Sequence, residues 1–142
     1  MKLPDVNLLL YAVDETSPHH ARARPWLEAM LSGAEPVGFA WVVVLAFVRL
    51  STRPQLFAEP LDPADAFDLV EGWLAQPCAV VVNPTERHPA ILRGLVESTG
   101  TAGNITSDAH LAALAIEHGG EVHSADADFG RFPALRWSNP LA

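Results

Sequence analysis

The side chains best suited to chemistry are carboxylates that lie far apart along the chain. Asp5 interrupts an apolar run near the N-terminus, Asp108 lies at the start of an expected helix, and Asp126 and Asp128 directly follow an expected strand. In a parallel sheet, the carboxyl ends of the strands and the first turns of the following helices lie along one edge. We therefore expect these carboxylates to converge there.

A cluster of carboxylates needs a counter-charge, because unpaired acids repel one another and raise each other's pKa. A ligand set made only of oxygens favours Mg²⁺, or Mn²⁺, over zinc. The acids thus predict a site for such a cation at this edge of the sheet, with Asp5, Asp108, Asp126 and Asp128 as its candidate ligands.

Each acid also has a structural interpretation. Asp5 can cap a turn, and Asp108 can be a helix-start acid stabilised by the helix dipole. Asp126 and Asp128 can form an Asx-turn. Only the joint placement of the acids favours a metal site.

The elements that must position these residues alternate along the chain. Apolar runs predict strands at residues 3–11, 36–40, 79–82, 121–125 and 135–137, with the runs at 3–11 and 79–82 buried. Helical spacing and end signals predict helices at 17–31, 62–75, 85–98 and 107–118, a loop at 100–104 and a left-handed stop at Gly119. Residues 41–52 fit a helix by length, although three consecutive valines also suit a strand. This order predicts an α/β fold with a mainly parallel sheet covered on both faces.

Composition and charge limit the classes of protein to which the chain can belong. The 142 residues suggest one domain spanning 1–142. The net charge of −8 argues against a broad basic surface for nucleic acid, but it leaves room for a nuclease whose acids hold a cation. The single Cys78 excludes a disulfide framework. No apolar run approaches the ~20 residues of a membrane span, and no signal peptide is recognisable, so we expect a cytoplasmic protein without a membrane partner.

Two other classes of enzyme fit the sequence poorly. A phospho-aspartyl protein also gathers acids at this edge of a sheet, but it uses a lysine beside the phosphoryl group, and the only lysine is Lys2. A serine hydrolase of the α/β type needs a Gly-x-Ser-x-Gly turn, which the sequence lacks.

Three segments in order resemble the PIN-domain ribonucleases, in particular the VapC-type toxins of bacterial toxin–antitoxin operons. They are residues 3–11 (LPDVNLLLY), 103–114 (GNITSDAHLAAL) and 124–132 (SADADFGRF). The resemblance implies a three-layer α/β/α PIN-like domain, Mg²⁺-dependent RNA cleavage, a homodimer and inhibition by a cognate antitoxin protein. It also implies phosphodiester hydrolysis, in which a bound cation lowers the pKa of the attacking water and offsets the developing charge. Asp5, Asp108 and Asp126 would be the catalytic residues, with Asp5 and Asp108 as principal metal ligands and Asp126 as a direct or water-mediated ligand. Asp128 would lie behind Asp126, and Asn7 and Ser124 would contact the ligands or the substrate.

One position departs from the family pattern. Many PIN nucleases place a glutamate in the helix after the second strand, just before an apolar-apolar-Arg sequence, and here that position is Ala46. No acid occurs between residues 36 and 58. The alternative is therefore a silenced module that binds antitoxin or RNA without cleavage. Ala46 is then either a natural subgroup variant or an engineered inactivation.

Basic and aromatic residues suggest where partners bind. Arg49, one turn beyond Ala46, is a candidate phosphate contact, whereas Arg53 and most other arginines are expected to be solvated. The four tryptophans are more typical of a core or an interface than of base stacking. The helix with Trp26 and Met30 and the segment 42–48 have more apolar surface than a small sheet must bury, which predicts a dimer interface or an antitoxin groove.

Overall fold

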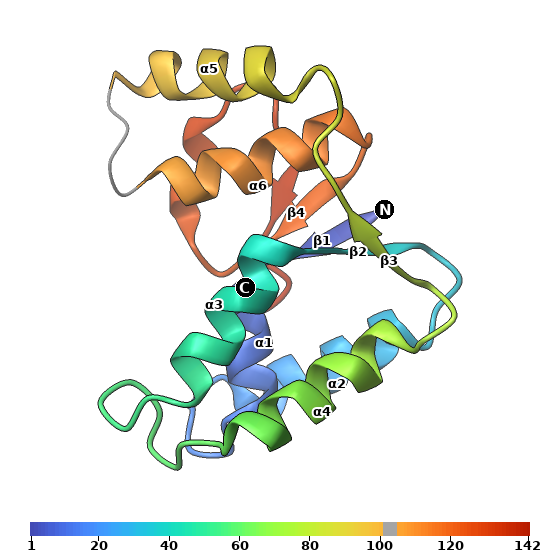
Figure 1. Cartoon of the computed structure of the whole chain (residues 1–142), viewed down its shortest axis with the longest axis vertical. Helices are drawn as coiled ribbons and strands as arrows, with labels where there is room; N and C mark the ends of the chain where they lie inside the picture. Colours follow the sequence, from blue (N-terminus) through green and yellow to red (C-terminus); the bar gives the residue numbers. More distant parts are fainter. Residues whose placement is uncertain (101–104) are drawn as a thin grey trace.

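A five-stranded parallel sheet forms the centre of the computed structural model, which describes residues 1–100 and 105–142 (Figure 1). The strands are β1 (Lys2–Pro4), β2 (Val37–Ala40), β3 (Ala79–Val82), β4 (Glu121–His123) and β5 (Trp137–Ser138). Their order across the sheet is β3-β2-β1-β4-β5, and all four pairings are parallel. The predicted parallel sheet is confirmed.

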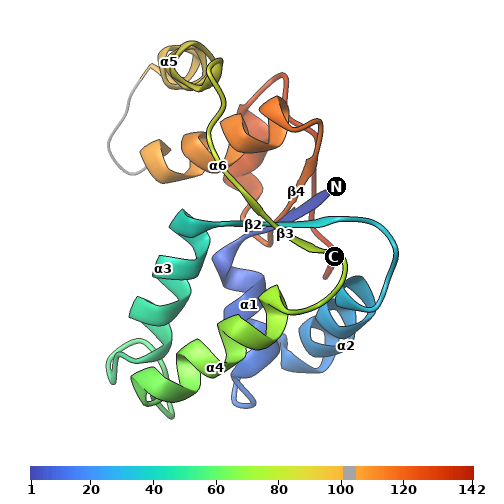
Figure 2. The ribbon, with the colours of Figure 1, turned by 45° about the vertical axis from the view of Figure 1, so that its right-hand side comes forward.

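Helices cover both faces of this sheet (Figures 1 and 2). On one face lie α1 (Val6–Val13), α2 (His20–Leu31), α3 (Trp41–Ser51) and α4 (Pro63–Leu74). On the other face lie α5 (His88–Thr99) and α6 (Thr106–Glu117), with α6 between α5 and strand β4. A short 3₁₀ helix, η2 (Ala127–Arg131), follows β4. The three-layer α/β/α fold is therefore confirmed.

The prediction of a buried strand over residues 3–11 is wrong beyond Pro4. The strand ends there, and Asp5 caps a helix by accepting a hydrogen bond from the amide of Val6, with Oδ1 to N at 2.8 Å. A run of leucines fits a buried strand and a buried helix equally well in a short segment. In the structure Leu8, Leu9 and Ala12 form the buried face of α1.

Three other predicted segments have different outcomes. The strand at 79–82 exists, but it is the edge of the sheet, and Val80 and Val81 are 40% and 43% exposed rather than buried. The segment at 41–52 is a helix, as favoured. Of the predicted loop at 100–104, only Gly100 lies within the described residues.

The core holds the ends of the site-bearing elements rigidly. Helix α6 is buried along most of its length, with Leu111, Leu114 and the alanines between them almost fully covered. Gly119, with φ of +66°, provides the predicted left-handed stop after α6.

Among the described residues, no helix is both long and apolar enough to cross a membrane.

Candidate active site

Two of the predicted acids share one pocket at the carboxyl edge of the sheet. The pocket has a volume of about 330 Å³. Asp5, between β1 and α1, and Asp108, in the first turn of α6, both line it. Helix α3 supplies the opposite wall with side chains that include Leu45, Ala46 and Arg49. The carboxylates of Asp5 and Asp108 are thus brought together from sequence positions 103 residues apart.

Asp5 is held by a set of directed hydrogen bonds. The residue is 8% exposed, and its Oδ2 accepts from the hydroxyl of Ser124 at 2.7 Å and from Nδ2 of Asn7 at 3.3 Å. Burial raises the pKa of Asp5 above its usual value, the hydrogen bonds from Ser124 and Val6 counteract this, and the charge of Asp126 raises the pKa further. The carboxylate is therefore fixed in orientation.

Ser124 connects Asp5 to the other polar residues of the edge. It is fully buried, directly after β4, and its Oγ accepts from Nδ2 of Asn7 at 3.1 Å and from the amide of Asp126 at 3.0 Å. The Asn7 side-chain oxygen in turn accepts from the amide of Ala125 at 3.3 Å. The structure thus places Asn7 and Ser124 against Asp5.

Asp108 has no hydrogen-bond partner within residues 1–100 and 105–142. Its side chain is half-buried, and burial together with the charges of Asp5, Asp126 and Asp128 raises its pKa to about 6. A carboxyl group this perturbed, lying in a pocket with a second carboxylate, is typical of functional sites.

Asp126 and Asp128 lie at the margin of the site. Asp126 caps η2, accepting from the amide of Asp128 at 2.9 Å, which is the Asx-turn that the sequence left open. Asp128 forms an ion pair with Arg131 at 3.4 Å. Neither acid lines the pocket, although both lie close enough to raise the pKa of Asp108. Asp126 is joined to Asp5 through Ser124, and Asp128 is the more remote of the two.

The residues fit a hard divalent cation that keeps most of its water. Among the described residues, no three His, Cys, Asp or Glu side chains lie close enough together to enclose an ion. Mg²⁺ needs no such cage, because one or two carboxylates together with waters and substrate phosphate commonly hold it. Asp5, which its hydrogen bonds hold in place, and Asp108, whose pKa is raised, supply those two carboxylates.

Ala46, the position at which the sequence departs from the pattern of the resembled family, faces the same pocket. Helix α3 contains no Asp or Glu, so no neighbouring acid replaces the expected glutamate. Arg49, one turn further on, also lines the pocket and is exposed.

A buried polar cluster that no sequence pattern predicts joins α5 to α6. Glu117 accepts from the amide of Thr85 at 2.8 Å and from its hydroxyl at 2.6 Å, and it also bonds to Nδ1 of His88. Nε2 of His88 lies 2.9 Å from Nδ1 of His110. Burial alone would raise the pKa of Glu117, but its hydrogen bonds to Thr85 and His88 outweigh this and lower it.

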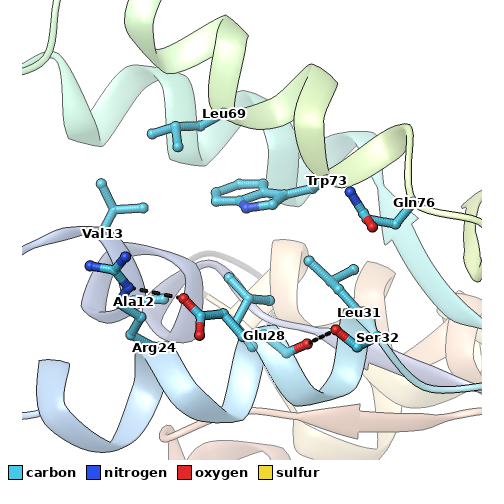
Figure 3. Close-up of a pocket in the computed structure, with 10 residues that line it drawn as sticks. Ala12, Val13, Arg24, Glu28, Leu31, Ser32, Leu69, Trp73 and Gln76 are labelled. Carbon is cyan, nitrogen blue, oxygen red and sulfur yellow. Dashed lines mark hydrogen bonds and ion pairs between the residues drawn. The ribbon is translucent and has the colours of Figure 1, made fainter.

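A second pocket, of about 450 Å³, lies away from the acids, between α2 and α4 (Figure 3). Trp73 and Leu69 of α4 face Leu31 of α2 across it, and the ion pair between Arg24 and Glu28 lies at its side. Leu27 also lines this pocket. The helix with Trp26 and Met30 exposes less apolar surface than predicted, because Met30 is buried and Trp26 is partly buried.

Comparison with known proteins identifies the family. The sequence pattern of the PIN domain matches residues 2–135. The chain therefore belongs to the PIN-domain family. Among curated proteins it is 54% identical to Ribonuclease VapC37 of Mycobacterium tuberculosis over 142 residues, covering 100% of the chain and 99% of that protein. It is 41% identical to Ribonuclease VapC33 of the same organism over 141 residues, covering 99% of both chains. Within the PIN family, these relatives are VapC ribonucleases.

Solved structures have the same fold at low sequence identity. VapBC2 from Rickettsia felis, bound to a DNA fragment from its promoter, superimposes with a TM-score of 0.70 at 15% identity, covering 97% of each chain. Mycobacterium tuberculosis VapC20, a Sarcin-Ricin loop cleaving toxin, gives a TM-score of 0.66 at 16% identity, covering 96% of this chain and 99% of that one.

Proposed function

We propose that the chain, acting as one domain over residues 1–142, is the toxin of a type II toxin–antitoxin system and an Mg²⁺-dependent (or Mn²⁺-dependent) endoribonuclease. The observation that carries this proposal is the shared pocket of Asp5 and Asp108, in which the pKa of Asp108 is raised to about 6. The family relationship to VapC ribonucleases supports RNA as the substrate.

The residues of the pocket have separable roles in this proposal. Asp5 and Asp108 hold the cation, which when bound activates a water and neutralises charge at the phosphate. Asp126 contributes from the margin, with Asp128 behind it. Ser124 and Asn7 fix the rotamer of Asp5 through their hydrogen bonds, so that its carboxylate needs no reorganisation when substrate arrives. Arg49 contacts the phosphate backbone of the RNA.

The proposal includes a cognate antitoxin protein, and the similar folds solved as VapBC assemblies support it. The pocket between α2 and α4 is apolar and large enough to take side chains of such a partner. A homodimer is also proposed, with the exposed Trp41 and Leu45 of α3 as candidate contacts. An RNA-cleaving toxin acts where RNA is made and translated, which implies the cytoplasm.

Incubation of the purified chain with assorted structured RNAs, with and without Mg²⁺, tests the reaction. Cleavage at defined positions is expected only with the metal, and Asp5→Asn or Asp108→Asn should reduce it by orders of magnitude. Asp68→Asn, at an exposed acid of α4, is the matched control and should leave the rate unchanged. Equal cleavage in excess EDTA would contradict the metal-dependent reaction.

The alternative function, a module that binds without cutting, rests on Ala46. Ala46→Glu adds a third carboxylate to the wall of the pocket opposite Asp5. Ala46→Gln has the same size without the charge and serves as its control. Metal-dependent cleavage that appears only in the glutamate variant would show that the chain with Ala46 is silenced. Cleavage by the unmodified chain would show that the remaining aspartates suffice.

A further inference from the structure

Two histidines face each other between α5 and α6. His88, at the start of α5, is 7% exposed, and His110, in α6, is partly buried. Nε2 of His88 lies 2.9 Å from Nδ1 of His110, and the planes of the two rings meet at 78°. Neither residue lines the pocket of Asp5 and Asp108. The proposed reaction therefore gives these two rings no role.

Glu117 holds His88 in the form that a metal ligand needs. Its carboxylate bonds to Nδ1 of His88, so in the neutral ring the proton is on Nδ1 and Nε2 carries a lone pair. Two hydrogen bonds from Thr85 fix this carboxylate, and the Glu117 side chain is fully buried. A metal-ligating histidine almost always donates from its other ring nitrogen to a carboxylate, a carbonyl or a water. The pairing of Glu117 with His88 has this arrangement.

The separation of the two ring nitrogens suits a shared ion. Zinc–nitrogen bonds are about 2.0–2.1 Å long, so two of them at roughly 90–110° place the nitrogens about 2.9–3.4 Å apart. The observed 2.9 Å lies at the lower end of this range. An N–H···N hydrogen bond donated by His110 has a similar length, so a metal ion would compete with a single shared proton. Coordination therefore needs only small shifts of the two rings.

We propose that Nε2 of His88 and Nδ1 of His110 bind Zn²⁺ or a similar transition-metal ion, with Glu117 hydrogen-bonded behind His88. Imidazole nitrogens suit zinc, copper and nickel, whereas Mg²⁺ prefers oxygen ligands. The chain supplies two ligands rather than a closed cage, so water completes the coordination. The proton on Nδ1 of His110 passes through solvent to Nε2 of the same ring, which stays neutral.

The charge of Glu117 offsets part of the charge of the ion. Although burial alone would raise the pKa of Glu117, its hydrogen bonds from Thr85 and His88 lower it, so the group stays ionised. The bound ion ties the start of α5 to α6. It differs from the cation of the acid pocket in both place and ligand chemistry, so this inference is independent of the proposed ribonuclease function.

Isothermal titration calorimetry with ZnCl₂ tests the site. All chains carry Asp108→Asn, so that the acid pocket keeps only one of its two carboxylates. We expect one zinc ion per chain, with no competition from MgCl₂. Glu117→Gln keeps the shape of the side chain without its charge and should weaken zinc binding about 10- to 100-fold.

Removal of a ligand should have at least as large an effect. His110→Asn leaves only His88 to bind the ion and should weaken zinc binding by about 100-fold or more. His19→Asn, at an exposed histidine just before α2, is the matched control and should leave the affinity unchanged.

NMR of the ring nitrogens locates the ion without any substitution of histidine. In the ¹⁵N-labelled Asp108→Asn chain, zinc should shift Nε2 of His88 and Nδ1 of His110 and leave the ring of His19 unchanged. Zinc should also raise the Tm of this chain, because a ligand of the native state stabilises it by mass action. These two measurements decide the matter even where His110→Asn or Glu117→Gln fails to fold.

Three results would overturn the site. Absence of zinc binding would mean that the two rings share only a hydrogen bond. An affinity that His110→Asn leaves unchanged would place the ion elsewhere on the chain. Ring shifts at His19 in place of His88 and His110 would show adventitious binding at the surface. RNA cleavage is measured separately, and its presence or absence bears on the nuclease alone.

Discussion

Asp5 serves two purposes at once. One carboxylate oxygen caps α1, and the other accepts from Ser124 and Asn7 while the side chain lines the pocket. Asp108 has neither a capping role nor a hydrogen-bond partner among the described residues. Asp5 therefore stabilises the fold as well as taking part in the proposed reaction, whereas Asp108 contributes to the proposed reaction alone.

The raised pKa of Asp108 predicts a pH-dependent cost to stability without metal. The group has a pKa of 3.8 in the unfolded chain and about 6 in the folded one, so the folded state binds more protons between these values. Stability therefore falls as pH rises through this window, and the full cost is present above pH 6. Asp108→Asn removes the charge, so in EDTA its Tm should equal that of the wild type near pH 4 and exceed it above pH 6.

Thermal unfolding in EDTA, over this pH range, checks the prediction. Adding Mg²⁺ should raise the Tm of the wild type and leave that of Asp108→Asn nearly unchanged, because a ligand of the native state stabilises it by mass action. A Tm difference independent of pH would show that Asp108 does not carry the perturbed charge.

Residue types were more predictable than residue contacts. The sequence predicts the two acids of the pocket because Asp5 interrupts an apolar run and Asp108 begins a helix, whereas Asn7 and Ser124 follow only from the family resemblance. No sequence pattern marks His88 or Glu117, because each lies at the end of an ordinary helix, where polar residues are common. Nothing local to either residue predicts that the two helix ends meet.

At the scale of elements, the order along the chain was largely predictable, whereas the burial of β3 and the type of the first long element were not. The alternation of strands and helices predicts the parallel sheet, yet an apolar run such as residues 79–82 looks the same at an edge as at the centre. The run at 3–11 fits a strand because only one residue, Asp5, marks the boundary after Pro4, and Asp5 acts as a helix cap only in its three-dimensional setting.

The cluster between α5 and α6 predicts a large local contribution to stability. In Glu117→Ala, the amide and hydroxyl of Thr85 and the ring of His88 lose their acceptor in a mostly buried place. The free energy of unfolding should fall by about 2–4 kcal/mol, measured by urea denaturation. Glu97→Ala, in the exposed ion pair with Arg93 on α5, is the control and should cost less than about 1 kcal/mol. Equal losses in both variants would mean that the cluster is no stronger than a surface pair.

At the scale of the molecule, the charge distribution shapes what the chain can bind. The excess of acids keeps nucleic acid from binding broadly, and seven of the nine cations are engaged with the chain's own oxygens. RNA contacts should therefore be few, and the dependence of affinity on salt should be shallow.

The proposed antitoxin contact predicts a separation between binding and folding. Leu69, partly buried, lines the pocket between α2 and α4, whereas Phe67 on the same helix is 45% exposed and lies outside it. Leu69→Asp should abolish complex formation with the cognate antitoxin in size-exclusion chromatography, because it buries an unpaired charge in the contact. Phe67→Asp should not. Circular dichroism confirms that both variants are folded, and loss of binding in both would point to a different surface.

The double duty of Asp5 has a consequence for how such a toxin can be disarmed. A substitution at Asp108 leaves every helix cap intact, so it should yield an inert protein that still occupies its antitoxin. A substitution at Asp5 removes the cap of the first helix, so it should lower the amount of folded protein as well as the activity. Cells selected for survival of the toxin should therefore accumulate a folded, inactive protein when Asp108 is substituted, and little folded protein when Asp5 is substituted.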